Sequence, residues 1–451
     1  MPIEKHSINI LEKAVTKLSD GFQGLPPYQM EYDKKRAEET LLKVAEKMWD
    51  NYPYPHPQYA GQMLKPPHPV ARMAYMLATW INPNNHALDG GKASSAMEKE
   101  SVAKIAGMFG WRQHLGHLTG GGTLANLEAL WVANNIHPGK TIVASSQAHY
   151  THNRICGVLQ IPFKSVPVDD DARMDKQALE EMLQQGDIGT VVVTLGTTGV
   201  GSVDPLPEIL TLQEKYGFRI HIDAAYGGYY CLANNLGESA TEAYSLLHKV
   251  DSIVIDPHKH GLQPYGCGCV LFQDTEVGKF YKHDSPYTYF SSNELHLGEI
   301  SLECSRAGAA AVALWATLEM YPLERGGEFA TGLEKCRQAA LVLYDRLAND
   351  DRFVTPLVPD LDIVIWAPKA VTTSEMSRLS KLAFERAEEK ELHLATFSYP
   401  SHLIKKAFPE VEADTEHTIC MRSCLMKPDH LEWVEPIWSI LDQVQNEISI
   451  T

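Results

Sequence analysis

Short apolar and β-branched runs alternate with segments of helical periodicity between about residues 98 and 275. Six runs are predicted as strands, at residues 141–145, 163–168, 190–195, 218–223, 252–256 and 269–272. Helices are predicted between them at residues 123–134, 176–185, 206–216 and 241–249. Alternation of this kind is typical of a mostly parallel sheet covered by helices, so the predicted fold class is α/β.

A stretch rich in proline and histidine precedes this region. It reads Tyr52-Pro53-Tyr54-Pro55-His56-Pro57, and a similar run follows at Pro66-Pro67-His68-Pro69. Prolines at this density exclude a helix, because each one removes a backbone donor and fixes φ. We expect an extended arm here that packs across another part of the assembly, such as a partner subunit.

The length of the chain indicates more than one structural unit. Its 451 residues exceed what a single hydrophobic core usually organises. We expect an N-terminal arm over residues 1–80, a large domain over 81–325 that ends in an Ala-rich helix at 307–320, and a smaller C-terminal α/β domain over 326–451. In the last part a strand is predicted at 362–366 and a charged helix near 374–390.

Composition and charge exclude several classes of protein. The net charge of −17 disfavours nucleic acid and anionic membrane surfaces as partners. No stretch approaches the ~20 apolar residues of a membrane span, and Met1 to Asp20 lack a signal-peptide core, so a soluble cytoplasmic protein is expected. The eight cysteines lack paired C-x-x-C spacing and are interpreted as reduced, mostly buried thiols.

A glycine run comes directly before the first predicted helix. In Gly120-Gly121-Gly122-Thr123, glycines leave room for a phosphate where free N–H groups and the helix dipole converge. The plain alternative is a turn that merely starts a helix. A second candidate, Gly139-Lys140-Thr141, is rejected as a P-loop because Asn134 stands where that motif needs glycine and because the triplet enters a strand.

Two charged residues follow neighbouring predicted strands. Asp223 ends one strand, where a carboxylate could pair with a protonated pyridine nitrogen, and Lys259 follows the next strand, where an amine could attack an aldehyde. Taken singly, Asp223 is as well explained as a helix N-cap or metal ligand, and Lys259 as a solvated surface lysine.

Smaller features accompany this pair. His149 lies beyond the strand at 141–145, where a ring stacked on a planar cofactor would originate, and His152 lies three residues later. A histidine pair at this spacing could also bind metal or simply pack. Thr197 and Thr198 occupy a Gly-flanked turn, and Ala225 is small enough for a ring to lie flat against the sheet edge.

These motifs together resemble one family. Their order and approximate spacing are similar to those of the group II pyridoxal-phosphate-dependent L-amino acid decarboxylases, from about Pro57 to Gly308. The run from Asp256 to Gly261 and the compact length are most similar to the archaeal-type tyrosine/aspartate decarboxylases. The resemblance implies a fold-type I, aspartate aminotransferase-like architecture, pyridoxal 5′-phosphate as the cofactor, and no metal.

The resemblance also implies roles for individual residues. Lys259 would hold the cofactor as a Schiff base, Asp223 would pair with the pyridine nitrogen, His149 would stack on the ring and Ala225 would lie beneath it. Around the phosphate would lie Gly121, Gly122, Thr123 and His258, and further cofactor-binding candidates are Asn126 and Thr197. Two positions depart from the family, which often has Ser at Gly120 and Glu at Leu124.

A catalytic loop is expected at residues 281–296. In the family this loop contributes a tyrosine proton donor across the dimer interface, and we predict Tyr287 for this role ahead of Tyr289. Relatives with phenylalanine in place of this tyrosine turn towards oxidative deamination. Candidates for the substrate pocket are His56, His68 and Tyr59, together with Tyr287.

The predicted function is decarboxylation of an L-amino acid, aromatic such as tyrosine, or aspartate, in a homodimer with the active site at the subunit interface. Alternatives are a carbon–carbon lyase similar to sphingosine-phosphate lyase, an oxidative deaminase or aldehyde synthase, and a cofactor-bound paralogue without activity. The last is disfavoured because an inactive protein has no chemical need for Lys259, Asp223 and His149 together.

Overall fold

A computed structural model describes residues 5–26, 28–86, 88–282 and 301–449. Within these ranges, seven strands form one sheet in the order β1-β7-β6-β5-β4-β2-β3. The strands are β1 (Leu115–Thr119), β2 (Thr141–Ser145), β3 (Phe163–Val166), β4 (Ile188–Thr194), β5 (Arg219–Asp223), β6 (Ser252–Ile255) and β7 (Gly268–Phe272). All pairings are parallel except those of β7, which is antiparallel to β1 and β6. The predicted α/β class with a mostly parallel sheet is confirmed.

Helices cover this sheet, which is why its central strands are buried along almost their whole length and consist mainly of apolar residues. They are α4 (Lys92–Met108), α5 (Gly122–Ile136), α6 (Thr151–Leu159), α7 (Lys176–Leu183), α8 (Leu206–Tyr216), α9 (Glu238–Ser245) and α11 (Gly308–Met320). Short 3₁₀ helices occur at η2 (Leu88–Gly90), η3 (Gly228–Leu232), η4 (Leu247–Lys249) and η5 (Thr275–Phe280). Helix α5 packs against β6 and β7, which places its N-terminus at the sheet edge.

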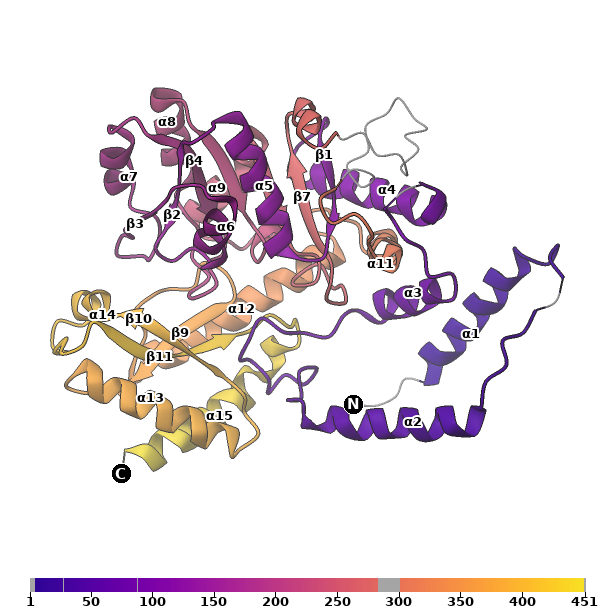
Figure 1. Cartoon of the computed structure of the whole chain (residues 1–451). Coiled ribbons are helices and arrows are strands. Elements are labelled where there is room, and N and C mark those ends of the chain that lie inside the picture. The colour runs from indigo at the N-terminus through magenta and orange to yellow at the C-terminus, as the bar shows by residue number, and fades with distance from the viewer. Residues whose placement is uncertain (1–4, 27, 87, 283–300, 450–451) are drawn as a thin grey trace.

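A smaller sheet follows in the C-terminal part. Its order is β10-β11-β9-β8, antiparallel throughout, with β8 (Phe353–Val354), β9 (Ile363–Pro368), β10 (Ala395–Pro400) and β11 (His417–Cys424). Its helices are α12 (Glu328–Ala348), α13 (Thr373–Glu388), α14 (Ser401–Ala407) and α15 (His430–Ile448). Figure 1 shows this unit below the large sheet, with α13 and α15 on its outer face. A separate apolar cluster around Trp366 forms its core.

The first two helices of the N-terminal part project from the body of the protein, whereas its third packs against α11 (Figure 1). It contains α1 (Lys5–Asp20), α2 (Lys34–Lys47), η1 (Met48–Asp50) and α3 (Pro69–Thr79). Neither α1 nor α2 has a buried residue. Residues 51–68 contain no helix, as their prolines predict, and they run between the large and small sheets.

Several elements differ from the expectations. The run at 269–272 was expected in a mostly parallel sheet, but its strand is the antiparallel one. The helix predicted at 241–249 begins earlier, at Glu238, and gives way to a 3₁₀ turn after Ser245. Strand β1 was not predicted, because Gly116 and His117 interrupt its apolar pattern. No helix in the described part of the chain is long and apolar enough to cross a membrane.

Candidate active site

The carboxyl ends of parallel strands bring distant segments to one edge of the large sheet. There, β4, β5 and β6 end beside the N-terminus of α5, and a cavity of about 450 Å³ lies between them. The residues lining it are Gly120, Gly121, Gly122, Thr123, Leu124, Asn126, Leu127, His149, Thr151, Thr194, Thr198, Asp223, Ala225, Tyr226, Asp256, His258 and Lys259.

Most of the site residues predicted from the sequence line this cavity. They are Gly121, Gly122, Thr123, Asn126, His149, Asp223, Ala225, His258 and Lys259. Thr197 does not line it, because its side chain is fully buried and bonds Ser202 within the turn at an oxygen–oxygen distance of 2.9 Å. The neighbouring Thr198 faces the cavity instead. Tyr287 and Tyr289 lie outside the described residues.

The glycine run forms a narrow cup at the start of α5. Gly121 has φ +155°, a value that side-chain-bearing residues rarely adopt. A Cβ on Gly122 would lie 2.6 Å from Asp256 Oδ2, so only glycine fits there without a shift. The N–H groups of the first helical turn, including those of Gly122 and Thr123, have no acceptor within the helix and suit a phosphate.

Asp223 is a buried carboxylate held in its charged form. Its Oδ2 lies 2.8 Å from His152 Nε2, and its Oδ1 accepts the Ala225 N–H at 3.1 Å. Burial raises the pKa of Asp223, but the hydrogen bond and charge of His152 and the charge of Lys259 outweigh it and hold the pKa well below the ordinary value. The cavity therefore presents a fixed negative charge at the end of β5.

The amine of Lys259 lies close to a second carboxylate. Lys259 Nζ is 3.3 Å from Asp256 Oδ2, and its side chain is 20% exposed, so the amine is reachable from the cavity. His258 Nδ1–H donates to the Cys267 carbonyl at 2.8 Å, which leaves Nε2 on the opposite side of the ring. Its Cε1 would lie 3.5 Å from a Cβ on Gly121, so the ring borders the glycine cup.

His149 is a neutral ring beside the cavity. Burial lowers its pKa, and Thr151 donates its N–H to His149 Nδ1 at 3.3 Å. An acceptor at Nδ1 implies that the neutral ring carries its proton on Nε2. A neutral, flat imidazole is suited to stacking on an aromatic cofactor.

The side chain of Asn126 is held by His221, a residue to which the sequence analysis gave no role. The Asn126 Oδ1 accepts from His221 Nε2 at 2.8 Å, and His221 Nδ1 lies 2.9 Å from Ser252 Oγ. Burial lowers the pKa of His221 to about 3, so the ring is neutral and its Nε2–H donates. Asn126 Nδ2 in turn donates to the Gly122 carbonyl at 2.9 Å, and this bond helps to fix the glycine cup.

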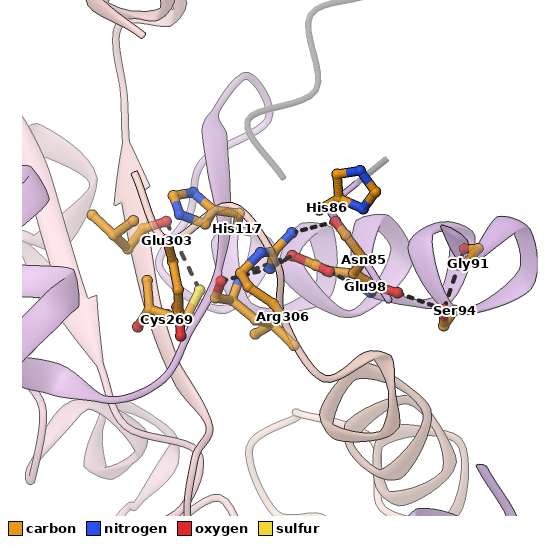
Figure 2. Close-up of polar contacts among 12 residues, drawn as sticks. Asn85, His86, Gly91, Ser94, Glu98, His117, Cys269, Glu303 and Arg306 are labelled. Carbon is orange, nitrogen blue, oxygen red and sulfur yellow. Dashed lines mark hydrogen bonds and ion pairs between the residues drawn. The ribbon is translucent and has the colours of Figure 1, made fainter. Parts of the chain in front are cut away.

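A buried ion pair holds the segment that begins at residue 301 against the rest of the large domain. Arg306 Nη1 lies 2.7 Å from Glu98 Oε1 and also donates to the Leu118 carbonyl at 2.8 Å (Figure 2). Asn85 donates its amide to Glu98 Oε2 at 2.6 Å. On the same returning segment, Glu303 Oε2 accepts the Gly120 N–H at 2.8 Å. Gly120, at the rim of the cavity, is thus hydrogen-bonded to a residue 183 positions later in the chain.

In the structure, His152 contacts Asp223 and is not part of a cluster of metal ligands. Its Nε2 bonds Asp223, and no group of three His, Cys, Asp or Glu residues that could hold a metal occurs in the part of the chain that the structure describes. Sequence reasoning missed the supporting roles of His152 and His221, since their partners lie 71 and 95 residues away.

The three described candidates for the substrate pocket lie elsewhere in this chain. His56 packs edge-on against Trp433, with ring centroids 4.8 Å apart. Tyr59 is buried beneath Lys427. His68 contacts Tyr321 at the entrance of a different cavity. None of the three is among the residues that line the cavity at the sheet edge.

The donor set fits pyridoxal phosphate. An accessible lysine amine can hold an aldehyde, a charged buried carboxylate can pair with a pyridinium nitrogen, and a helix N-terminus with a glycine cup can hold a phosphate. All three groups border one cavity, and its volume lies in the usual range for cofactor sites.

Comparisons with known proteins agree with this geometry. The family model described as "Pyridoxal-dependent decarboxylase conserved domain" matches residues 53–367. An L-tyrosine decarboxylase of Enterococcus faecium is 27% identical, with 72% of this chain and 70% of the relative covered. An L-aspartate decarboxylase of Thermococcus kodakarensis is 29% identical, with 62% and 72% covered.

Solved structures show the same fold. The Oryza sativa TDC solved with PLP and tryptamine superposes with a TM-score of 0.78 at 17% identity, and 99% of each chain is covered. This likeness confirms the predicted fold-type I class and its smaller C-terminal domain.

Proposed function

Because the chain belongs to the family of pyridoxal-dependent decarboxylases, we propose that it converts an L-amino acid, tyrosine or aspartate, into the amine and CO₂. The family resemblance drawn from the motifs is confirmed by the match. The observation that carries the proposal is the convergence of Lys259, Asp223 and His149 with the α5 N-terminus around one cavity.

Particular residues would hold the cofactor. Lys259 Nζ would bind its aldehyde carbon, Asp223 its ring nitrogen, and Gly122, Thr123 and His258 its phosphate. Pyridoxal phosphate, when bound, supplies an electron-accepting ring for the electrons released as the Cα–carboxylate bond breaks. Asp223 would support this electron-accepting role, because its low pKa keeps a negative charge available to pair with the ring nitrogen.

Two side chains of this chain are candidates for donating the proton that Cα receives. His149 carries a proton on Nε2 and borders the cavity, so it is a candidate donor to Cα after CO₂ leaves. Tyr287 is the second candidate, on the evidence of sequence alone. Thr198 in place of Thr197 is proposed to contact the cofactor or the substrate, because Thr198 lines the cavity.

The choice of tyrosine or aspartate is supported by the relatives. They are named for decarboxylation of L-tyrosine or L-aspartate, and the two compared above differ by only two percentage points in identity. The relatives therefore do not rank one amino acid above the other, and an activity screen decides between them.

A homodimer is part of the proposal. The N-terminal helices expose apolar side chains that a monomer would leave in water, among them Ile8 (58% exposed), Leu41 (67%), Leu42 (60%) and Trp49 (79%). Neither α1 nor α2 buries a residue in the single chain. Exposed apolar surface of this kind indicates a protein interface, and a second copy of the chain supplies a matching one. Light scattering after size-exclusion chromatography should give twice the chain mass.

We also propose a cytoplasmic location. All eight cysteines are unpaired in the structure, and seven of them are buried, which fits a reducing compartment.

The test is a screen of the twenty amino acids with the purified, cofactor-loaded protein for CO₂ and amine. We expect release of both in equal amounts from tyrosine or aspartate. Lys259→Ala should abolish turnover and the visible absorbance of the bound cofactor, whereas Lys381→Met, at an exposed position of α13, should leave both unchanged. Absence of a visible band in the wild-type protein after addition of cofactor would refute the proposal.

The same screen separates the alternatives. Aldehyde with ammonia and hydrogen peroxide would identify an oxidative deaminase. Aldehyde formed without CO₂ would identify a carbon–carbon lyase. No product with a normal cofactor band would identify a protein without decarboxylase activity.

A further inference from the structure

A second cavity lies where the proline-rich segment meets the start of α12. Its volume is about 370 Å³, within the range of small-molecule sites. It shares no lining residue with the cofactor cavity. Its walls come from the proline-rich segment, the start of α12, the turn before α15 and the residues after Lys259: Pro55, Lys65, Pro66, Pro67, His68, Pro69, His260, Leu262, Tyr321, Glu328, Phe329, Thr331, Gly332, Leu333, Lys335, Cys336, Lys427, Pro428 and Asp429.

Three lysines line this cavity; Lys335 is exposed, whereas Lys65 and Lys427 are at least partly buried and form no ion pair with a described carboxylate. No described carboxylate oxygen lies within the 4.0 Å ion-pair limit of Lys65 or Lys427. Lys65 Nζ donates to the Met426 carbonyl at 3.3 Å, and Lys427 Nζ donates to the Tyr59 carbonyl. An ammonium group has three donors, so each lysine in its protonated form has two donors beyond these bonds.

Burial makes this arrangement costly. Lys427 is only 4% exposed, and Lys65 is half-buried. Burial, and then the charge of Lys65, lowers the pKa of Lys427 to about 7, while burial also lowers the pKa of Lys65. Buried cations are normally paired, because removing a charge from water is unfavourable. A bound anion would relieve both desolvation and mutual repulsion.

The other charged groups of the cavity do not supply that anion. Asp362 does not line the cavity but contacts His260, which does. Its Oδ2 lies 3.2 Å from His260 Nε2, and its Oδ1 accepts a hydrogen bond from the Tyr226 hydroxyl at 2.6 Å. Glu328, Asp429 and Lys335 lie exposed at the rim, which therefore carries two carboxylates and one ammonium group. The net negative charge of this rim disfavours a ligand with several negative charges, so a single charge is favoured.

Apolar walls define the rest of the ligand. Pro66, Leu262, Phe329 and Leu333 line the cavity around the two ammonium groups, and the Phe329 and Leu333 side chains are nearly inaccessible to water. We propose that this cavity, the dilysine cavity, binds a small organic monocarboxylate, with its carboxylate between Lys65 and Lys427 and its apolar body against these walls. The site is separate from the decarboxylation chemistry and does not depend on turnover.

The test uses holoenzyme whose cofactor aldehyde has been blocked with phenylhydrazine, so that the catalytic cavity cannot take up the probe. Calorimetric titration with 3-phenylpropionate should show one site per chain. The neutral 3-phenylpropanamide should bind at least tenfold more weakly, because the two ammonium groups would meet no charge. Inorganic phosphate should also bind more weakly than 3-phenylpropionate, because it fills none of the apolar volume.

Two variants address the site without relying on the most buried lysine. Lys65→Met removes one ammonium group, and Thr331→Trp, at an exposed position on α12, fills the cavity while keeping both lysines. Each should weaken 3-phenylpropionate binding at least tenfold, while Lys381→Met should not change it. Absence of binding to the blocked wild-type holoenzyme would overturn the proposal, as would undiminished binding by both variants. Tighter binding of phosphate would refute the ligand class.

Discussion

The buried pair between Glu98 and Arg306 allows a quantitative test of how the rim of the active site is held. Glu98 is 1% exposed and Arg306 is 9% exposed. Glu98→Gln preserves the shape but removes the negative charge that lies 2.7 Å from Arg306 Nη1. Breaking a buried pair from one side costs about 3–5 kcal/mol. Because whole proteins are stable by only about 5–15 kcal/mol, the loss should be large.

The assay is a double-mutant cycle of Glu98→Gln and Arg306→Met, read from urea unfolding of the holoenzyme by circular dichroism. Once Glu98 has been neutralised, removing Arg306 no longer breaks an ion pair with it. The two changes together should therefore cost less than the sum of the single changes, by at least about 0.5–3 kcal/mol. Arg346 and Glu435 form a matched pair at the surface, where the same substitutions should cost less than about 1 kcal/mol.

The pair also predicts a dependence on pH. Burial raises the pKa of Glu98, but the charge and hydrogen bond of Arg306 outweigh it, so the pKa in the folded protein lies below the ordinary 4.5. The stability that this group contributes is fully present above pH 4.5 and is lost as the pH falls towards the folded-state pKa. Glu98→Gln should flatten this acid limb. Additive costs in the cycle, or an unchanged acid limb, would refute the reasoning.

Three further predictions concern the candidate active site. Asp223→Ala should retain part of the cofactor but lower kcat at least about a hundredfold, equal to about 2.7 kcal/mol of transition-state stabilisation; unchanged turnover would contradict the role of its charge. His152→Phe should raise the pKa of Asp223 and lower kcat, since a hydrogen bond to a charged group contributes about 1.5–3 kcal/mol; His248→Phe at the surface is the control and should leave kcat unchanged. Gly122→Ala should weaken pyridoxal phosphate binding at least tenfold in a spectrophotometric titration, because its Cβ would lie 2.6 Å from Asp256 Oδ2, whereas Gly157→Ala, with open space around the new carbon, should not.

Local pattern was sufficient for much of the large sheet. The predicted ranges of β2 and α8 coincide with those in the structure, because an apolar run bounded by turn residues and an amphipathic period are both encoded locally. The direction of β7 was not predictable in this way, because side chains alternate identically in parallel and antiparallel strands. In the C-terminal part, β8, β10 and β11 were not predicted, although β11 runs over eight residues.

The residues of the candidate active site were likewise only partly predictable from the sequence. Asp223 and Lys259 could be chosen from the sequence, because each follows an apolar strand and the carboxyl ends of parallel strands share one edge. The choice between Thr197 and Thr198 could not, because it depends on which hydroxyl the turn directs towards Ser202.

By itself, the sequence determined the α/β class, the positions of the glycine cup and the amine, and the absence of a helix across the proline-rich segment, because each depends on neighbours within a few residues. Only the tertiary structure decided which residues distant in sequence contact one another. It placed His152 on Asp223 and joined Lys65 to Lys427 in a cavity across some 360 residues of chain. Such contacts depend on packing of whole elements, so residues far apart in sequence acquire their charge state and their chemistry only in the folded chain.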